Sequence, residues 1–175
     1  MHRRLALAAC AIVCAAPASA LDLPSRKSGL WEIKMTSETR GGPPQVMQHC
    51  IDAATDKLMN ANVGGVAKDT CPKQEMKNVG GSIVVDSVCN IGGGTTSSHA
   101  VFTGDFNQAY TVKISTKSEG VPARAGGTPG QAVSTNMTIE AKWTGACKAG
   151  QKPGDIIMPG GMKVNILEMP GMPRR

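Results

Sequence analysis

The chain has 175 residues and a formal net charge of +6, with lysines and arginines scattered along its length and only 3% aromatic residues. Scattered positive charge favours solubility, and so few aromatic rings offer no series of stacking platforms for single-stranded nucleic acid. We therefore expect no nucleic-acid partner. The length suits a single domain that buries about 68–70% of the surface its unfolded chain exposes.

The first 20 residues are typical of a cleavable export signal. A basic pair is followed by an apolar run over residues 5–16, which is too short to span a bilayer, and by a small-residue cleavage site that ends at Ala20. We predict that residues 1–20 are removed and that the mature protein is periplasmic, without a transmembrane segment. A lipoprotein anchored at Cys10 is the weaker alternative, because only five apolar residues precede that cysteine.

An even number of cysteines remains after this leader, which in an exported chain predicts disulfide bonds instead of metal ligands or nucleophiles. They are Cys50, Cys71, Cys89 and Cys147. The entropy of loop closure does not choose between the pairings, since the estimates differ by less than their error. A three-residue turn over residues 79–81 would place Cys71 opposite Cys89 and leave Cys50 for Cys147. A two-residue turn at Gly80 and Gly81 would instead place Cys71 opposite Asn90, so the pairing depends on the turn type.

Apolar and polar residues alternate with a period of two along most of the chain, which indicates half-buried antiparallel strands. The alternation is clearest over residues 136–143. The other predicted strands span residues 29–36, 45–51, 70–78, 83–89, 96–103 and 110–115. Residues 52–60 favour one short helix, with Asp52 as its cap. We predict an all-β fold, a curved antiparallel meander or partly closed barrel of about seven strands, with one short helix and two disulfides.

Two segments rich in glycine and proline lie outside these strands. One is residues 119–133, and the other is residues 148–175, which also contain four methionines. We therefore divide the chain into the leader, a disulfide-linked β domain over residues 21–147 and a tail rich in Met, Pro and Gly over residues 148–175. Within the tail, Met162, Val164 and Ile166 alternate in a way that would add one edge strand.

Several short stretches, in this order and with this cysteine spacing, resemble a bacterial envelope family, domain of unknown function 3617. They are Gly29-Leu30-Trp31-Glu32-Ile33, Cys50-Ile51-Asp52, the hairpin between Cys71 and Cys89, Gly92-Gly93-Gly94, Gly104-Asp105-Phe106 and Trp143-Thr144-Gly145-Ala146-Cys147. The resemblance covers about residues 28–147. It implies an exported, β-rich bacterial domain, and it brings no established activity.

Catalytic residues are scarce in the predicted mature chain. Its two histidines are His49 and His99, and no Gly-x-Ser-x-Gly nucleophile motif is present. His99 falls in a predicted strand, where a surface histidine is the usual case. A metal site at His49 would compete with a disulfide at the neighbouring Cys50. We predict a non-enzymatic protein without a cofactor.

The predicted fold favours a binding function, because a small curved sheet has a concave apolar face. We expect a monomer that binds an envelope protein or a hydrophobic ligand. Trp31, Tyr110 and Trp143 are the candidate residues for that face, and they are also the residues that a core would use. One alternative to a binding function is an envelope enzyme or enzyme inhibitor.

The methionines of the tail suggest another function, because thioethers are soft ligands that select Cu(I). These residues are Met158, Met162, Met169 and Met172. Packing of the tail on the sheet is the favoured explanation for them, since no histidine or cysteine accompanies them.

Overall fold

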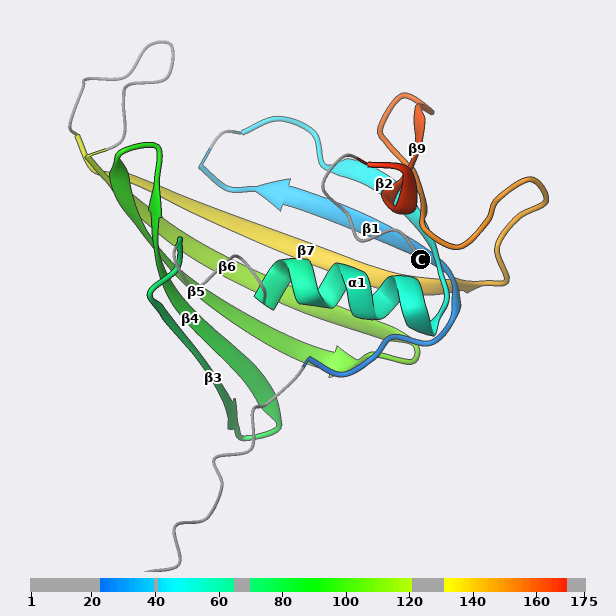
Figure 1. Ribbon diagram of the computed structural model, residues 1–175, viewed down its shortest axis with the longest axis horizontal. Coiled ribbons are helices and arrows are strands. Elements are labelled where there is room, and N and C mark those ends of the chain that lie inside the picture. Colours follow the sequence, from blue (N-terminus) through cyan, green and yellow to red (C-terminus); the bar gives the residue numbers. More distant parts are fainter. Residues whose placement is uncertain (1–22, 40, 65–69, 121–130, 170–175) are drawn as a thin grey trace, which may run out of the picture.

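The computed structural model describes residues 23–39, 41–64, 70–120 and 131–169. The predicted leader lies outside them, as does most of the segment 119–133. The described chain forms one curved antiparallel sheet with a single α-helix, α1 (Ala53–Gly64), on its concave side (Figure 1). The strands are β1 (Gly29–Ser37), β2 (Gln45–Ile51), β3 (Lys73–Val79), β4 (Ser82–Ile91), β5 (Gly94–Asp105), β6 (Ala109–Glu119), β7 (Val133–Gly145), β8 (Asp155–Ile157) and β9 (Lys163–Asn165).

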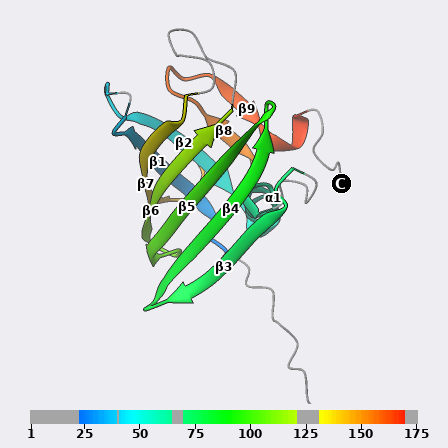
Figure 2. The same cartoon turned by 90° about the vertical axis from the view of Figure 1, so that its left-hand side faces the viewer.

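The sheet has the strand order β3-β4-β5-β6-β7-β1-β2-β8-β9 and does not close into a barrel. Strands β3 to β7 form a meander of hairpins, and Figure 2 shows the face of this meander that points away from α1. Strand β1 lies between β7 and β2, so that Trp31 pairs with Trp143 on one side and with His49 on the other. The first strand of the chain therefore joins the meander to the C-terminal strands.

The predicted all-β antiparallel fold with one helix and two disulfides is confirmed. Each of the seven predicted strands is present, and β9 is the edge strand that the alternation around Val164 indicates. Strand β8 was not predicted, because Asp155-Ile156-Ile157 shows no alternation of apolar and polar residues. The described part of the tail, residues 148–169, extends the sheet beyond β2 through the β8–β9 hairpin.

The turn between β3 and β4 is shorter than the predicted three-residue turn. The predicted disulfide between Cys71 and Cys89 is nevertheless present. The turn has two residues, Gly80 and Gly81, both with positive φ, and Val79 pairs with Ser82. This register alone would place Cys71 opposite Asn90. However, the backbone N–H of Asn90 donates to the carbonyl of Thr70, whereas Lys73 pairs with Val88. Two residues, Cys71 and Pro72, therefore face one residue, Cys89.

The extra residue acts as a bulge that brings Cys71 to its disulfide partner, Cys89. A proline that cannot donate to the ladder stands at this irregularity. The second bridge joins Cys50 to Cys147 and ties the end of β2 to the chain that follows β7.

Helix α1 begins at a reciprocal cap. The Asp52 side chain accepts a hydrogen bond from the backbone N–H of Thr55, and the Thr55 hydroxyl accepts one from the N–H of Asp52. One turn later Asp56, which is fully buried, accepts two hydrogen bonds from Arg26. The predicted helix and its cap are confirmed, and the helix is anchored to the segment that precedes β1.

Two clusters of buried side chains form the core. The first lies against α1 and contains Trp31, Ile33, Ile51 and Ala141, with Met59 of the helix packed on it. The second lies under the meander and contains Ile83, Phe102 and Val112. Tyr110 packs against both clusters and connects them.

Candidate ligand-binding face

The concave side of the meander carries cross-strand rows of side chains whose polarity changes along the strands. Residues that pair directly across antiparallel strands point to the same face, so each row can be followed through the register. The buried row contains Ile83, Phe102, Val112 and Ile139. Two residues further along lies an apolar row, Met76, Val85, Ala100, Ile114 and Met137. Two residues further again lies a hydroxyl row, Ser87, Ser98, Thr116 and Thr135.

Every member of the apolar row and of the hydroxyl row is only half-buried. Figure 1 shows that α1 covers the part of the sheet near the start of β1 and leaves the opposite end of the concave side uncovered by the helix. The concave side is thus filled at one end and open at the other. It changes from apolar to hydrogen-bonding toward the open end.

A pocket of about 360 Å³ lies at this open end. Met35, Ile114 and Met137 provide its apolar lining, and Thr116 and Thr135 belong to the hydroxyl row. The connection between β1 and β2 forms a wall through residues 41–43. Its volume lies near the lower limit of small-molecule sites, which span about 300–1,000 Å³.

The three aromatic candidates from the sequence lie near this face but do not line the pocket. Trp31 is fully buried, and its indole N–H donates to the carbonyl of Lys27. Tyr110 is half-buried and stacks on Phe106. Trp143 is half-buried, with the ammonium group of Lys27 3.7 Å from its ring centroid. Trp31 is therefore a core residue, and all three pack against the first core cluster or belong to it.

The residues that do form the open end were missed by the sequence reasoning. Ser98 lies in the predicted strand 96–103, and Thr116 directly follows the predicted strand 110–115; both occupy core-facing positions. A serine or threonine there signals a polar interruption of an apolar face. Only the register shows that four such residues on neighbouring strands form one row.

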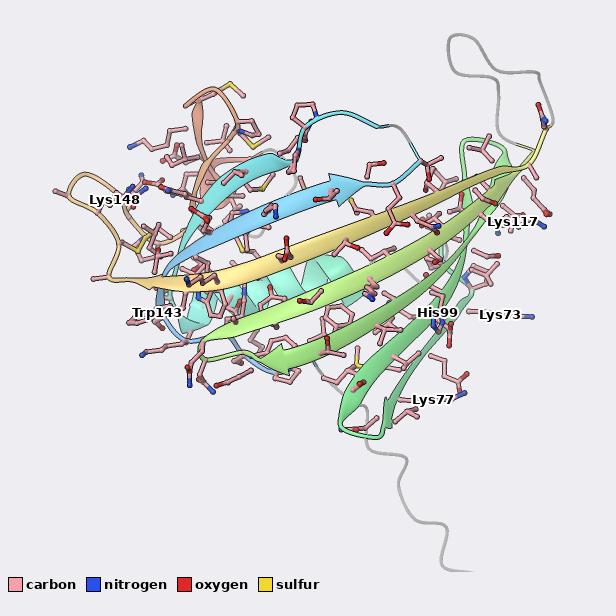
Figure 3. The ribbon with its side chains drawn as sticks, turned by 180° about the vertical axis from the view of Figure 1, so that it is seen from behind. Lys73, Lys77, His99, Lys117, Trp143 and Lys148 are labelled. Carbon is pink, nitrogen blue, oxygen red and sulfur yellow. A yellow bond between two sulfur atoms is a disulfide. The ribbon has the colours of Figure 1, made fainter. Side chains whose placement is uncertain are left out.

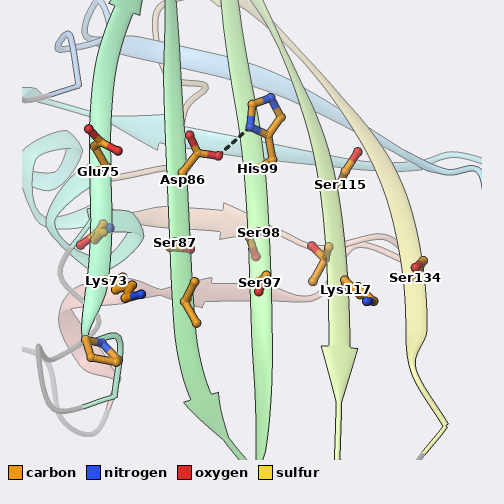
Figure 4. Close-up of a pocket in the computed structure, with 14 residues that line it drawn as sticks. Lys73, Glu75, Asp86, Ser87, Ser97, Ser98, His99, Ser115, Lys117 and Ser134 are labelled. Atoms are coloured by element: carbon orange, nitrogen blue, oxygen red, sulfur yellow. Dashed lines mark hydrogen bonds and ion pairs between the residues drawn. The ribbon is translucent and has the colours of Figure 1, made fainter.

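A larger hollow, a shallow trough of about 780 Å³, lies on the outer face of β3 to β7, and three members of the hydroxyl row, Ser87, Ser98 and Thr116, are also among its lining residues. Figure 3 shows this face, with His99, Lys73 and Lys117 near one end. Figure 4 shows its polar side chains arranged in rows across the strands. One row places Asp86, His99 and Ser115 on three neighbouring strands.

This row has the residue types of a nucleophilic triad but lacks one of the hydrogen bonds that a triad needs. The His99 Nδ1 lies 2.7 Å from an Asp86 carboxylate oxygen, and about half of each side chain is exposed. A serine nucleophile needs a hydrogen bond to the histidine and a site that excludes water. The described contacts of His99 include Asp86 and no bond to Ser115. An exposed ion pair on a sheet surface accounts for these two residues.

The other histidine is buried at the edge of the first core cluster. Burial, and to a lesser extent the positive charge of Arg26, lower the pKa of His49 from 6.5 to about 4. Its Nε2 lies 3.1 Å from the sulfur of Met47. Cys50, next along β2, points to the opposite side and is bonded to Cys147, so that the bridge leaves His49 unobstructed.

The described tail methionines lie around the β8–β9 turn and after β9. The backbone N–H of Met158 donates to the carbonyl of Met162, and Met162 and Met169 are exposed. Met172 lies outside the described residues. Among the described residues, no group of three or more His, Cys, Asp and Glu side chains is placed to hold a metal ion. Copper binding by the tail stays a prediction.

These features define a disulfide-linked, single-sheet β protein with an amphipathic concave face. The chain belongs to the DUF3617 family, described as a protein of unknown function, whose family model matches residues 26–147. The match ends at the second bridge, so β8 and β9 lie beyond it. No curated protein and no solved structure matched the chain. In the described part of the chain, no helix is long and apolar enough to cross a membrane.

Proposed function

We propose that the protein is a non-catalytic binder of a single-chain amphiphile, which it holds on the concave face of the meander. The apolar tail would lie on the apolar row and reach the buried row, and the head group would accept or donate hydrogen bonds at the hydroxyl row. The observation that carries this proposal is the change in polarity along half-buried rows toward the open end of the sheet.

The dimensions of the face support this choice. The buried row and the hydroxyl row are four positions apart along a strand. At 3.2–3.4 Å per residue, the face therefore extends about 13 Å from the hydroxyl row to the buried row, where it is closed. One leaflet of a bilayer has a hydrocarbon depth of about 15 Å, half of the usual 30 Å core, and this is the depth that an acyl chain fills. A single acyl chain therefore matches the depth of the face.

The chemistry of the hydroxyl row supports a head group that is held by hydrogen bonds and not by an ion pair, which includes the carboxylate of a fatty acid. Its four members are serines and threonines, which both donate and accept hydrogen bonds. The charged side chains that flank them in sequence, such as Lys117, point to the outer face. Binding should therefore depend little on salt concentration.

The proposed compartment is the periplasm, reached through a cleavable leader. Disulfides persist in exported proteins and are rare in the cytosol. The two bridges of the structure fit an oxidising compartment. In the envelope, a binder of amphiphiles meets lipids and their breakdown products.

The experiment uses delipidated, oxidised protein and the fluorescent fatty acid cis-parinaric acid. We expect saturable binding with one equivalent. Met137→Gln, on the apolar row, should weaken binding by about fivefold, which corresponds to about 1 kcal/mol of lost apolar contact. Adding Ile114→Gln should weaken it further.

The matched control is Thr138→Gln, which introduces the same side chain one residue away on the outer face. It should bind the probe as the unaltered protein does. Equal losses for the two variants would argue against the concave face, and an absence of saturable binding would refute the proposal for single-chain amphiphiles.

A further inference from the structure

Met47 and His49 lie side by side on the concave side of β2, apart from the proposed amphiphile pocket. They are two positions apart along the strand, so both side chains point the same way. The His49 Nε2 is 3.1 Å from the Met47 sulfur, and both residues are half-buried. His49 pairs across the sheet with Trp31, the centre of the first core cluster.

The two ring nitrogens of His49 lack good hydrogen-bond partners. Its Nδ1 is buried without a hydrogen-bond partner, the one side-chain nitrogen or oxygen of this kind within the described residues. On the other side of the ring, a thioether is a weak acceptor. A buried polar atom without a partner costs folding free energy, and such an atom in a native protein calls for a structural or functional reason.

The protonation state suits a metal ligand. Burial and the nearby charge of Arg26 keep the pKa of His49 at about 4, so the ring is neutral at neutral pH. In the tautomer that carries the proton on Nδ1, the lone pair of Nε2 faces the Met47 sulfur. The charge of Arg26 itself is balanced, because Asp56 accepts hydrogen bonds from its Nε and its backbone N–H. The environment is thus close to neutral overall.

The ligand types select a soft ion. Imidazole nitrogen and thioether sulfur favour Cu(I), whereas Mg²⁺ and Ca²⁺ require oxygen ligands. Two carboxylates are buried in this part of the fold, and both already have partners: Asp56 is engaged by Arg26, and Asp155, which precedes the residue that pairs with His49, accepts hydrogen bonds from Asn165 and from the backbone N–H of Lys152. Two further thioethers, those of Met35 and Met59, pack against the same core cluster. The Met59 sulfur already accepts a hydrogen bond from the Arg26 guanidinium, which also lies 5.9 Å from the Trp31 ring centroid.

We propose that Met47 and His49 form a binding site for a soft monovalent metal ion, Cu(I), with the thioether and the imidazole as its ligands. Bonds of about 2.0 Å to nitrogen and 2.3 Å to sulfur, the lengths seen on zinc, span up to about 4.3 Å between the two ligand atoms. From their separation of 3.1 Å, the pair would open by up to about 1.2 Å to admit the ion, a movement that the flexible Met side chain allows. The site is independent of the tail methionines and of amphiphile binding.

The test measures Cu(I) affinity anaerobically, in competition with bathocuproine disulfonate. The protein is the exported, oxidised chain, treated with N-ethylmaleimide so that no free thiol takes part. We expect one high-affinity equivalent, accompanied by quenching of tryptophan fluorescence and by a shift of the His49 ring resonances. Met47→Leu and His49→Gln should each lower the affinity at least tenfold.

Controls separate this site from the others. His99→Gln removes the exposed histidine, and Met162→Leu removes an exposed tail methionine; both should leave Cu(I) affinity unchanged. Met47→Leu keeps the volume and apolar character of the side chain, so this variant decides the matter even if His49→Gln fails to fold. Unaltered affinity in Met47→Leu, or binding lost only in Met162→Leu, would overturn the proposal.

Discussion

Arg26 and Asp56 form a buried ion pair that holds α1 to the segment before β1. The guanidinium Nε lies 2.7 Å from one carboxylate oxygen, and the backbone N–H of Arg26 lies 2.8 Å from the other. The Asp56 side chain is fully buried and that of Arg26 is 7% exposed. The helix that closes one end of the concave side therefore depends on a contact between residues 30 positions apart.

Removal of one partner of this pair should destabilise the fold strongly. Arg26→Met leaves the buried carboxylate of Asp56 without its cation, and such a loss typically costs about 3–5 kcal/mol. Urea unfolding measures the change. The exposed pair Lys34–Glu140 is the control, because Lys34→Met should cost less than about 1 kcal/mol. Similar costs for the two variants would show that the Arg26–Asp56 pair does not anchor the helix.

The two disulfides should differ in what they contribute to stability. By the loop-entropy estimate, closing the long loop of Cys50–Cys147 is worth about 4.7 kcal/mol and closing the short loop of Cys71–Cys89 about 3.2 kcal/mol. Replacing both cysteines of a bridge by serine should therefore cost more for Cys50–Cys147, whose Cys50 is also fully buried. Chemical unfolding of the two double variants measures the order, and a greater loss at Cys71–Cys89 would contradict it.

Stability should fall on acidification because of His49. The folded pKa of about 4 lies below the unfolded value of 6.5, so that between these values the unfolded chain binds a proton that the folded protein does not. The contribution of His49 is complete above pH 6.5 and is lost as the pH falls to about 4, a change of about 3 kcal/mol.

His49→Gln should therefore flatten the pH dependence of the unfolding free energy over this range. The comparison with the unaltered protein isolates the histidine from the carboxylates that titrate in the same range. A His49→Gln variant with an unchanged slope would show that the ring is not buried in solution.

Gly29 occupies a position that no other residue fits. Its φ is 129°, and an added Cβ would collide with the carbonyl oxygen of Gly145 and with the indole nitrogen of Trp143. Gly29→Ala should separate β1 from β7. The collision should lower the free energy of unfolding by at least about 1 kcal/mol, in addition to the strain of placing an alanine at positive φ. Gly41→Ala is the matched control, since its φ is 62° and its Cβ would meet no atom within 4 Å. Equal melting temperatures for the two variants would contradict this.

The sequence predicted the strands and the helix well because their signals are local. The alternation that ends at Trp143 and the cap at Asp52 each depend on neighbouring residues. The bridge at Cys71 was predicted with the wrong turn, since a bulge beside Pro72 restores the pairing that the shorter turn removes. The shorter turn and the bulge shift the strand pairing in opposite directions, so neither of them alone reveals that Cys71 lies opposite Cys89.

The candidate site was less accessible to sequence reasoning because it is built from long-range register. Ser98 and Thr116 lie 18 positions apart and become neighbours only when β5 pairs with β6. The pair formed by Arg26 and Asp56 likewise joins distant segments. The aromatic residues, chosen because they are large and apolar, proved to fill or flank the core, and smaller side chains line the open face.

The most direct test of amphiphile binding is to map where the ligand lies. A diazirine derivative of palmitic acid, photolysed in complex with the oxidised protein and followed by peptide mass spectrometry, labels the residues that its tail touches. We expect labelling on the concave residues of β4 to β7, centred on Val85, Ile114 and Met137. This label should be lost when unlabelled palmitic acid competes. Competable labelling confined to the outer face around His99, or to the tail after Cys147, would contradict it.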